Sequence, residues 1–183
     1  MKLFEFLEPP DPGRLFDPLD DPLELIRREH DRQSQVCDQL DELFNFLGLE
    51  PVADWASSLR RFLSEDLPRH IKDEEEDLFP VLTRRCAGHE GLELILAQLT
   101  SEHELDMGLV EPILRELETI VEAGAPSNPT RFLADVRAFV ETQRRHLIWE
   151  NRAVLPLAEA RLTTADKKAL GRGMVARRSA SSA

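Results

Sequence analysis

One eleven-residue pattern occurs twice in this chain of 183 residues and constrains its fold more than any other feature. Residues 70–80 and 146–156 both read as a histidine, three residues, a glutamate, five residues and a proline. Residues four apart lie on one face of a helix, so each copy directs an imidazole and a carboxylate to the same side. Each copy also follows an isolated histidine, His30 or His103, by 40 or 43 residues. Together these positions supply four imidazoles and two carboxylates, a ligand set that suits a pair of transition-metal ions.

Length and composition exclude several classes of protein. A chain of this length forms one domain with a real core, and its 42% apolar and 32% charged residues suit a soluble, helix-rich protein. The net charge of −12 argues against nucleic acid and membrane lipid as partners, and no apolar run is long enough to span a bilayer. The first ten residues carry acidic side chains inside their apolar stretch, which is untypical of a signal peptide. Because Cys37 and Cys86 lie far apart, we expect free thiols and a cytoplasmic protein.

Apolar residues recur at steps of three and four along four long segments, a pattern typical of amphipathic helices. The predicted helices span about residues 23–47, 52–85, 92–123 and 130–161. Their connections are short, so sequential helices should be antiparallel neighbours. The sequence therefore predicts an all-α protein, with an antiparallel up-down-up-down four-helix bundle over residues 22–161. Residues 1–21, rich in proline and aspartate, are expected to form an irregular arm, and residues 162–183 a short helix capped by Thr163 and a disordered tail.

Several prolines fall inside these helices or near their ends. An interior proline removes a backbone hydrogen bond and bends a helix, so Pro68 predicts a kink just before His70. Pro80 and Pro156 close the two copies of the repeat and are expected to mark a change of direction near the helix ends.

The recurring histidines fall at similar heights in such a bundle. Those of the first two helices lie 18 residues before Gly48 and 19 residues after Pro51, about 27 Å from that connection at roughly 1.5 Å per residue. Those of the other two helices lie 21 residues before Gly124 and 17 residues after Pro129. Each also lies on the apolar stripe of its helix, so all four should face one interior. They are His30, His70, His103 and His146.

A carboxylate on an apolar stripe needs a partner, because a buried glutamate is rare unless it is paired or bound to a metal. The sequence therefore predicts a metal site whose ligands are His30, His70, Glu74, His103, His146 and Glu150. The alternative is an interior network of histidine–glutamate hydrogen bonds without metal. Glu75 is the nearest competitor of Glu74 within its acidic run.

Most other charges near these positions are expected to be solvated. The acidic run over residues 73–77 should lie largely on an exposed helix face. The acids beside the isolated histidines should do the same; they are Glu29, Asp31, Glu102 and Glu104. The basic residues near the end of the chain are also predicted to form a solvated face, with contact to an acidic partner as the alternative. They are Lys167, Lys168, Arg172, Arg177 and Arg178.

With these residues in this order, the chain resembles the hemerythrin-like, HHE cation-binding proteins over about residues 22–160. The resemblance rests on His30, the His70/Glu74 pair, His103 and the His146/Glu150 pair. It implies a centre of two non-haem iron ions. The two glutamates would bridge the ions together with an oxo or hydroxo group, and the histidines would cap each ion.

Two positions depart from the oxygen-carrying members of that family. Those proteins have a second histidine where this chain has Met107, and an aspartate where it has Asn151. Four histidines and two glutamates give each iron about four protein ligands, so water, hydroxide or an exogenous ligand should complete the coordination. The chain is more similar to the four-histidine, two-glutamate members, which include sensors and proteins that repair iron–sulfur clusters. The repair proteins also carry an N-terminal cysteine-bearing segment that residues 1–21 do not match.

The ligand set and the resemblance favour a di-iron protein that binds dioxygen, nitric oxide or peroxide, in sensing or in the response to oxidative or nitrosative stress. Two alternatives stay open. One is a di-iron oxidoreductase, which would need an electron-donor protein, and the other is an interaction domain, stabilised by metal, that binds a signalling partner. Ferritin-like Glu-x-x-His pairs and the H-E-x-x-H motif of zincins are absent from the sequence, and the lack of tyrosine excludes a tyrosyl-radical enzyme.

Overall fold

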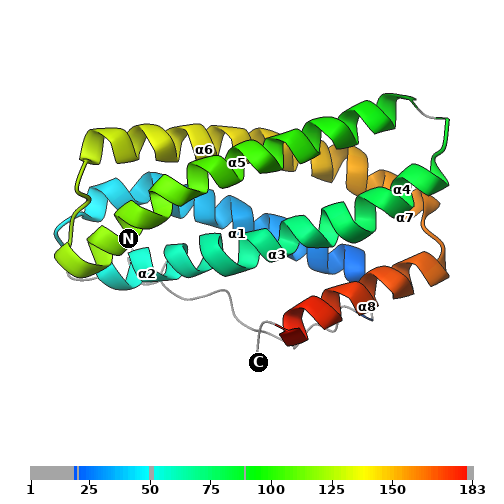
Figure 1. Ribbon diagram of the computed structural model, residues 1–183, viewed down its shortest axis with the longest axis horizontal. Coiled ribbons are helices and arrows are strands. Elements are labelled where there is room, and N and C mark those ends of the chain that lie inside the picture. The colour runs from blue at the N-terminus through cyan, green and yellow to red at the C-terminus, as the bar shows by residue number, and fades with distance from the viewer. Residues whose placement is uncertain (1–18, 20, 50–51, 89, 181–183) are drawn as a thin grey trace, which may run out of the picture.

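Four helical rods pack antiparallel along their length in the computed structural model, which describes residues 19, 21–49, 52–88 and 90–180 (Figure 1). In chain order they contain α1 (Pro22–Leu43); α2 (Val52–Arg61), α3 (Leu67–Lys72) and α4 (Phe79–Arg85); α5 (Glu90–Ala123); and α6 (Pro129–Trp149) and α7 (Leu155–Arg161). Each rod contacts the next, and α1 contacts α6 to close the bundle. The described residues contain no strand, so the predicted all-α bundle is confirmed.

The predicted arm over residues 1–21 lies outside the described residues, apart from residues 19 and 21, and so do residues 181–183 of the predicted tail. The proposed division of the chain into arm, bundle and C-terminal segment stays a prediction. Among the described residues, no helix is long and apolar enough to cross a membrane.

Two rods begin with the same local signal, an N-cap side chain that accepts a hydrogen bond from a backbone amide and is followed by proline. At α1 the Asp21 carboxylate accepts a hydrogen bond from the Glu24 amide at 3.2 Å. At α6 the Asn128 side chain accepts one from the Arg131 amide at 3.1 Å. Such caps satisfy amides that have no partner inside the helix, and proline fits the first helical position because it has no amide to satisfy.

The second and fourth rods are continuous helices, but three π-helical turns interrupt their α geometry. The turns are η3 (Phe62–Asp66), η4 (Asp73–Leu78) and η5 (Glu150–Val154). Each ends two residues before a proline: Pro68, Pro80 or Pro156. A proline donates no backbone hydrogen bond, and its ring collides with the carbonyl four residues earlier, which favours wider i→i+5 bonding in the preceding turn. The disturbance expected before His70 is therefore a π turn, with the helix continuing on both sides of it.

The apolar core consists of two clusters that occupy opposite halves of the bundle. One contains Leu40, Phe132 and Phe139, near the end where Gly48 and Gly124 turn the chain. The other lies toward the opposite end; it contains Leu23, Leu78, Leu82, Leu155 and Met174. Burial of each such side chain stabilises the folded state by roughly 1.5–3 kcal/mol. The recurring histidines and glutamates lie between these two clusters along every rod, so apolar packing holds this polar layer from both sides.

A fifth helix, α8 (Thr164–Ala180), packs along the bundle against α1 and η4 (Figure 1). Thr163 caps it as predicted, because its hydroxyl accepts from the Asp166 amide at 3.2 Å while the Asp166 carboxylate accepts from the Thr163 amide at 2.9 Å. Leu170 and Met174 are buried in the second apolar cluster, so α8 is part of the folded body.

Candidate metal centre

The six predicted ligands converge in the middle of the bundle, and none is more than 3% exposed. Their donor atoms form two groups in which all atoms lie within 4.8 Å of one another. The first group is His30, His70, Glu74 and Glu150, and the second is Glu74, His103, His146 and Glu150. The two glutamates thus belong to both groups. The structure brings all six residues together, and their role as ligands stays a prediction.

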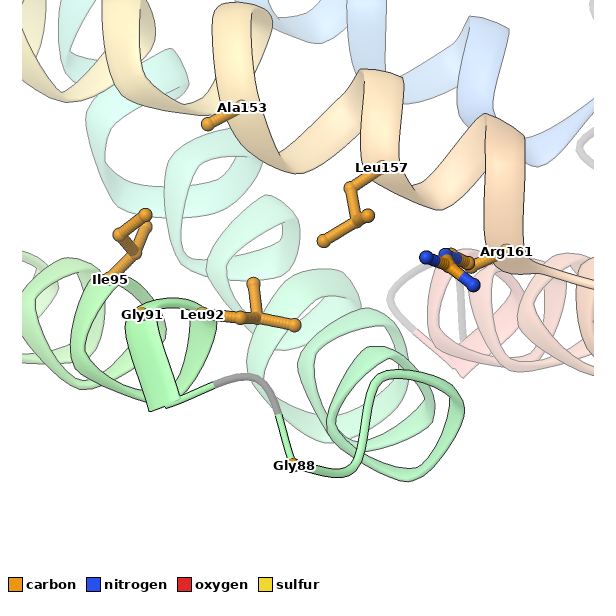
Figure 2. A pocket seen from close by; sticks show the side chains of 7 residues that line it. All are labelled: Gly88, Gly91, Leu92, Ile95, Ala153, Leu157 and Arg161. Atoms are coloured by element: carbon orange, nitrogen blue, oxygen red, sulfur yellow. The ribbon is translucent and has the colours of Figure 1, made fainter.

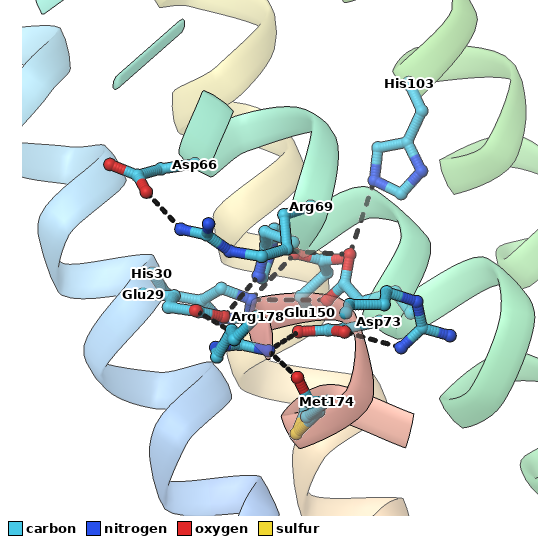
Figure 3. Close-up of polar contacts among 12 residues, drawn as sticks. Glu29, His30, Asp66, Arg69, Asp73, His103, Glu150, Met174 and Arg178 are labelled. Carbon is cyan, nitrogen blue, oxygen red and sulfur yellow. Dashed lines mark hydrogen bonds and ion pairs between the residues drawn. The ribbon is translucent and has the colours of Figure 1, made fainter. Parts of the chain in front are cut away.

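The Nε2 atoms of the four histidines of the cluster point into it. His30 Nε2 lies 3.2 Å from Glu150 Oε2 and 3.4 Å from Glu74 Oε1. His146 Nε2 lies 3.0 Å from Glu150 Oε1, and His70 and His103 each place Nε2 3.4 Å from Glu74 Oε2. Figure 3 shows part of this convergence, with His30, His103 and Glu150 labelled.

The Nδ1 atoms of the same four histidines point outward, each to a polar side chain of a neighbouring rod. The oxygen–Nδ1 pairs are Glu29 with His70 (3.1 Å), Glu75 with His103 (2.8 Å), Glu102 with His146 (3.2 Å) and Asn151 with His30 (2.8 Å). Each rod therefore supports the histidine of the next rod, and the four contacts close a cycle around the bundle. Such partners fix the orientation and tautomer of histidines that bind metals.

These outer contacts fix the tautomer that each ring adopts when it is neutral, as it must be to bind a metal. A carboxylate only accepts, so each histidine facing one must donate from Nδ1, which leaves a lone pair on Nε2 of the neutral ring. When both rings are neutral, the Nε2 lone pairs of His103 and His146 face each other across 3.0 Å. Neither Glu150 oxygen has a hydrogen-bond partner of normal geometry among the described residues, although imidazoles lie close by. A cation between these atoms would remove the repulsion, so the donor set fits a metal.

At His30, His103 and Glu150, nearby opposite charges and burial shift the pKa in opposite directions. Burial would lower the pKa of His30, but Glu150 and Glu74 outweigh it and raise that pKa well above its usual value. At His103 burial again opposes Glu74, and the result is a pKa raised to about 9. Burial would raise the pKa of Glu150, but His146 and His30 hold it well below its usual value. Without metal, protons on His30 and His103 therefore balance the buried carboxylates.

Metal uptake is expected to release protons and to weaken as the pH falls. An imidazole must lose its inner proton to bind a metal, and the raised pKa values mean that these protons are held at neutral pH. Titration of metal-free protein with ferrous iron, in a weak buffer with a pH indicator, measures both effects. We expect tighter binding at mildly alkaline than at mildly acidic pH. Equal affinity at both, without proton release, would contradict this.

Two acids expected to be surface charges are in fact part of the centre. Glu29 and Glu102 each precede an isolated histidine, yet each contacts the histidine of the next rod, and Glu102 is only 3% exposed. The solvated prediction was therefore wrong for both. The sequence does hold a signal, because the dipeptide Glu-His occurs at both isolated histidines. Glu75, the competitor of Glu74, lies outside the cluster as the partner of His103 Nδ1.

The two departures from the oxygen carriers occupy clear places. Asn151 lies outside the cluster and accepts from His30 Nδ1. Met107 is half-buried and packs against the first apolar cluster. Cys37 is buried in the same cluster as a free thiol, as predicted, and burial raises its pKa to about 12.

Three buried polar residues from three different helices, the polar trio, lie beside the histidines, toward the end with Gly48 and Gly124. Gln33, Asp106 and Gln143 are each three residues from a histidine of the cluster and at most 3% exposed. Gln143 Nε2 donates to Asp106 Oδ2 at 2.6 Å. Gln33 Nε2, Asp106 Oδ1 and Gln143 Oε1 have no hydrogen-bond partner in the described part of the chain. The two shared glutamates come four residues after their histidines, on the opposite side of the histidine layer.

A separate surface pocket of about 540 Å³ opens near the start of α5 (Figure 2). Its walls are mainly apolar side chains of α5 and α7, and Arg161 lies at one edge. None of the six predicted ligands lines it. The pocket is therefore distinct from the polar cluster inside the bundle.

Comparison with known proteins agrees with this geometry. Residues 21–158, well over half of the chain, match the model of the hemerythrin HHE cation binding domain. No curated protein matches the chain. The matched segment holds all six residues of the cluster and ends before α8. The chain belongs to the hemerythrin HHE cation-binding family.

Proposed function

We propose that this protein is a non-haem di-iron protein that binds dioxygen, nitric oxide or peroxide, in sensing or in the response to oxidative or nitrosative stress. The observation that carries the proposal is the pair of ligand groups that share Glu74 and Glu150. A carboxylate common to both groups would bridge two ions. The His30/His70 pair and the His103/His146 pair would each hold one ion from its own side.

This set of donor atoms suits iron better than it suits a structural zinc ion. Imidazole and carboxylate ligands are typical of non-haem iron, whereas structural zinc takes a closed set of four ligands. Each group here offers four protein residues, two of them shared, which leaves coordination positions for an exogenous ligand. When bound, the ions would supply these open positions and a change of oxidation state.

The polar trio of Gln33, Asp106 and Gln143 would interact with that exogenous ligand. These residues lie on the side of the histidine layer opposite the shared glutamates, and their unpaired atoms offer one donor and two acceptors. A buried polar atom without a partner costs about 1–3 kcal/mol, so a small polar ligand or a water between these residues would stabilise the site. We therefore assign the polar trio to binding of the exogenous ligand rather than to binding of the metal.

Reconstitution with ferrous iron under anaerobic conditions, followed by exposure to each candidate ligand, tests the proposed function. We expect two irons per chain and an absorption change with dioxygen, nitric oxide or peroxide. A protein that binds iron but responds to none of them would overturn the ligand-binding role and favour a metal-stabilised interaction domain. Steady consumption of nitric oxide or peroxide with a chemical reductant would indicate the oxidoreductase, whereas stoichiometric uptake would indicate binding.

Gln33→Leu is expected to keep both irons and to weaken binding of the exogenous ligand. One hydrogen bond contributes about 0.5–1.5 kcal/mol, so we expect a loss of about 2- to 10-fold in affinity for nitric oxide. Because Gln33 Nε2 has no partner among the described residues, the change should not unfold the protein. Gln35→Leu, at an exposed position of the same helix, is the control. Equal nitric oxide affinities in the two variants would contradict the assignment.

A further inference from the structure

The helix α8 is fastened to the bundle by two arginines that reach the acidic run of η4. Arg177 donates to Asp73 and Asp77, each at 2.6 Å, and Arg178 donates to Asp73 at 2.8 Å. Asp73 is fully buried under these contacts. The prediction of a solvated basic face was therefore wrong for both arginines. The acidic partner left open as the alternative is the chain itself.

The backbone of α8 also approaches η4 closely. A Cβ added at Gly173 would collide with the Asp77 carboxylate, so only glycine fits there without movement of that side chain. This close approach places the arginines over the π turn that begins at Asp73, the residue before Glu74. The helix lies beyond residues 21–158, the part of the chain that matches the family model.

One of these arginines is linked to a predicted metal ligand through a single carboxylate. Arg178 Nη2 donates to Glu29 Oε1 at 2.5 Å, and the other oxygen of Glu29 lies 3.1 Å from His70 Nδ1. Figure 3 shows Arg178 between Glu29 and Asp73, beside the labelled residues of the cluster. The guanidinium therefore fixes the carboxylate that in turn orients the His70 ring.

We propose that Arg178 is a positioning residue for His70, and that the docking of α8 sets the metal affinity of the His30/His70 position selectively. The inference rests on the proposed function, because it concerns one of the two ions assigned above. Arg178 acts by holding Glu29 where that carboxylate accepts the proton of His70 Nδ1.

The second metal position has a weaker version of the same arrangement. Glu102, the partner of His146 Nδ1, is approached by Arg145 at 3.4 Å and accepts from Gln98 at 3.0 Å. The Arg145 side chain is 54% exposed, whereas that of Arg178 is 23% exposed. Solvent screens an exposed pair, so Arg145 should contribute less to its position than Arg178 does. The chain thus offers a matched control.

Ferrous iron titrations of full-length Arg178→Gln and Arg145→Gln, compared with the unaltered chain, test the proposal. Loss of a side chain that orients a metal ligand typically lowers metal affinity about 10- to 100-fold. In Arg178→Gln we expect a loss of that size in one binding phase and an unchanged second phase. Arg145→Gln should leave the His30/His70 phase unchanged. Arg178→Lys, which keeps the charge, should recover part of the loss.

Glu29→Gln separates orientation of His70 from attachment of the helix. In this variant Arg178 still pairs with Asp73, so α8 stays docked, but the carboxylate beside His70 becomes a neutral amide. We expect the same binding phase to weaken, with little change in thermal unfolding. This variant keeps the test decisive even if Arg178→Gln loosens the helix.

Three results would each overturn either the proposal for α8 or the proposed function. Unchanged iron affinity in Arg178→Gln and Glu29→Gln, with only a lower unfolding temperature, would make α8 a packing element and nothing more. Equal weakening of both phases would also overturn the selective coupling. Failure of the unaltered chain to bind iron would instead overturn the proposed function, which the first two results leave intact.

Discussion

Glu74→Ala is expected to abolish iron loading at both positions, because this carboxylate belongs to both ligand groups. Its Oε1 faces His30, and its Oε2 faces His70 and His103, so this carboxylate contacts histidines of both groups. Each position would lose a ligand at once, and the bridge between them would disappear. Iron per chain after reconstitution and removal of excess metal measures the effect.

The control lies two residues away in the same acidic run. Glu76 is 58% exposed in its side chain and pairs with Arg177 on the surface. Glu76→Ala should therefore keep two irons per chain, with a small effect on stability, since exposed ion pairs contribute about 0–1 kcal/mol. Two irons retained in Glu74→Ala would remove the bridging role from Glu74.

His146→Ala is expected to remove one iron and leave the other. His146 belongs only to the group with His103, whereas His30, His70, Glu74 and Glu150 form a complete group without it. Loss of a direct ligand should weaken its position by more than the roughly 10- to 100-fold that loss of a ligand's hydrogen-bond partner causes. The measurement is again iron per chain, together with loss of the absorption features that depend on two coupled ferric ions.

Arg144→Ala is the matched control on the same helix. Arg144 pairs with Asp38 and Asp41 on the surface and is not among the residues of either ligand group. It should keep both irons. If His146→Ala also kept both, or lost both, the division of the cluster into two positions would be wrong.

The helices and the convergence of the cluster could be predicted from the sequence because both follow from simple periodicity. Apolar steps of three and four locate the rods, and short connections make them antiparallel neighbours. Counting residues from the turns then places all four histidines at similar heights. The structure agrees, since the six residues form one buried cluster.

The contacts around the cluster could not be predicted in the same way, because they join residues of different rods. Spacing along one helix shows which face a residue shares, but not which neighbouring side chain it meets. Glu29 therefore looked like a surface charge beside His30, whereas it supports His70 on the next rod. Arg178 lies 149 residues from the carboxylate that it holds, so no local pattern could reveal that pair.

The prolines that close the two repeats have a consequence for building this site into another helical protein. A π turn contains more residues than an α turn, so it shifts the phase of every residue that follows it along the rod. Glu74 lies in η4 and Glu150 begins η5. Regular α-helix precedes both turns, and each turn ends two residues before Pro80 or Pro156. The smallest portable module is therefore the whole eleven-residue repeat. A graft of the histidine–glutamate pair alone would leave the apolar residues after the glutamate in the wrong phase.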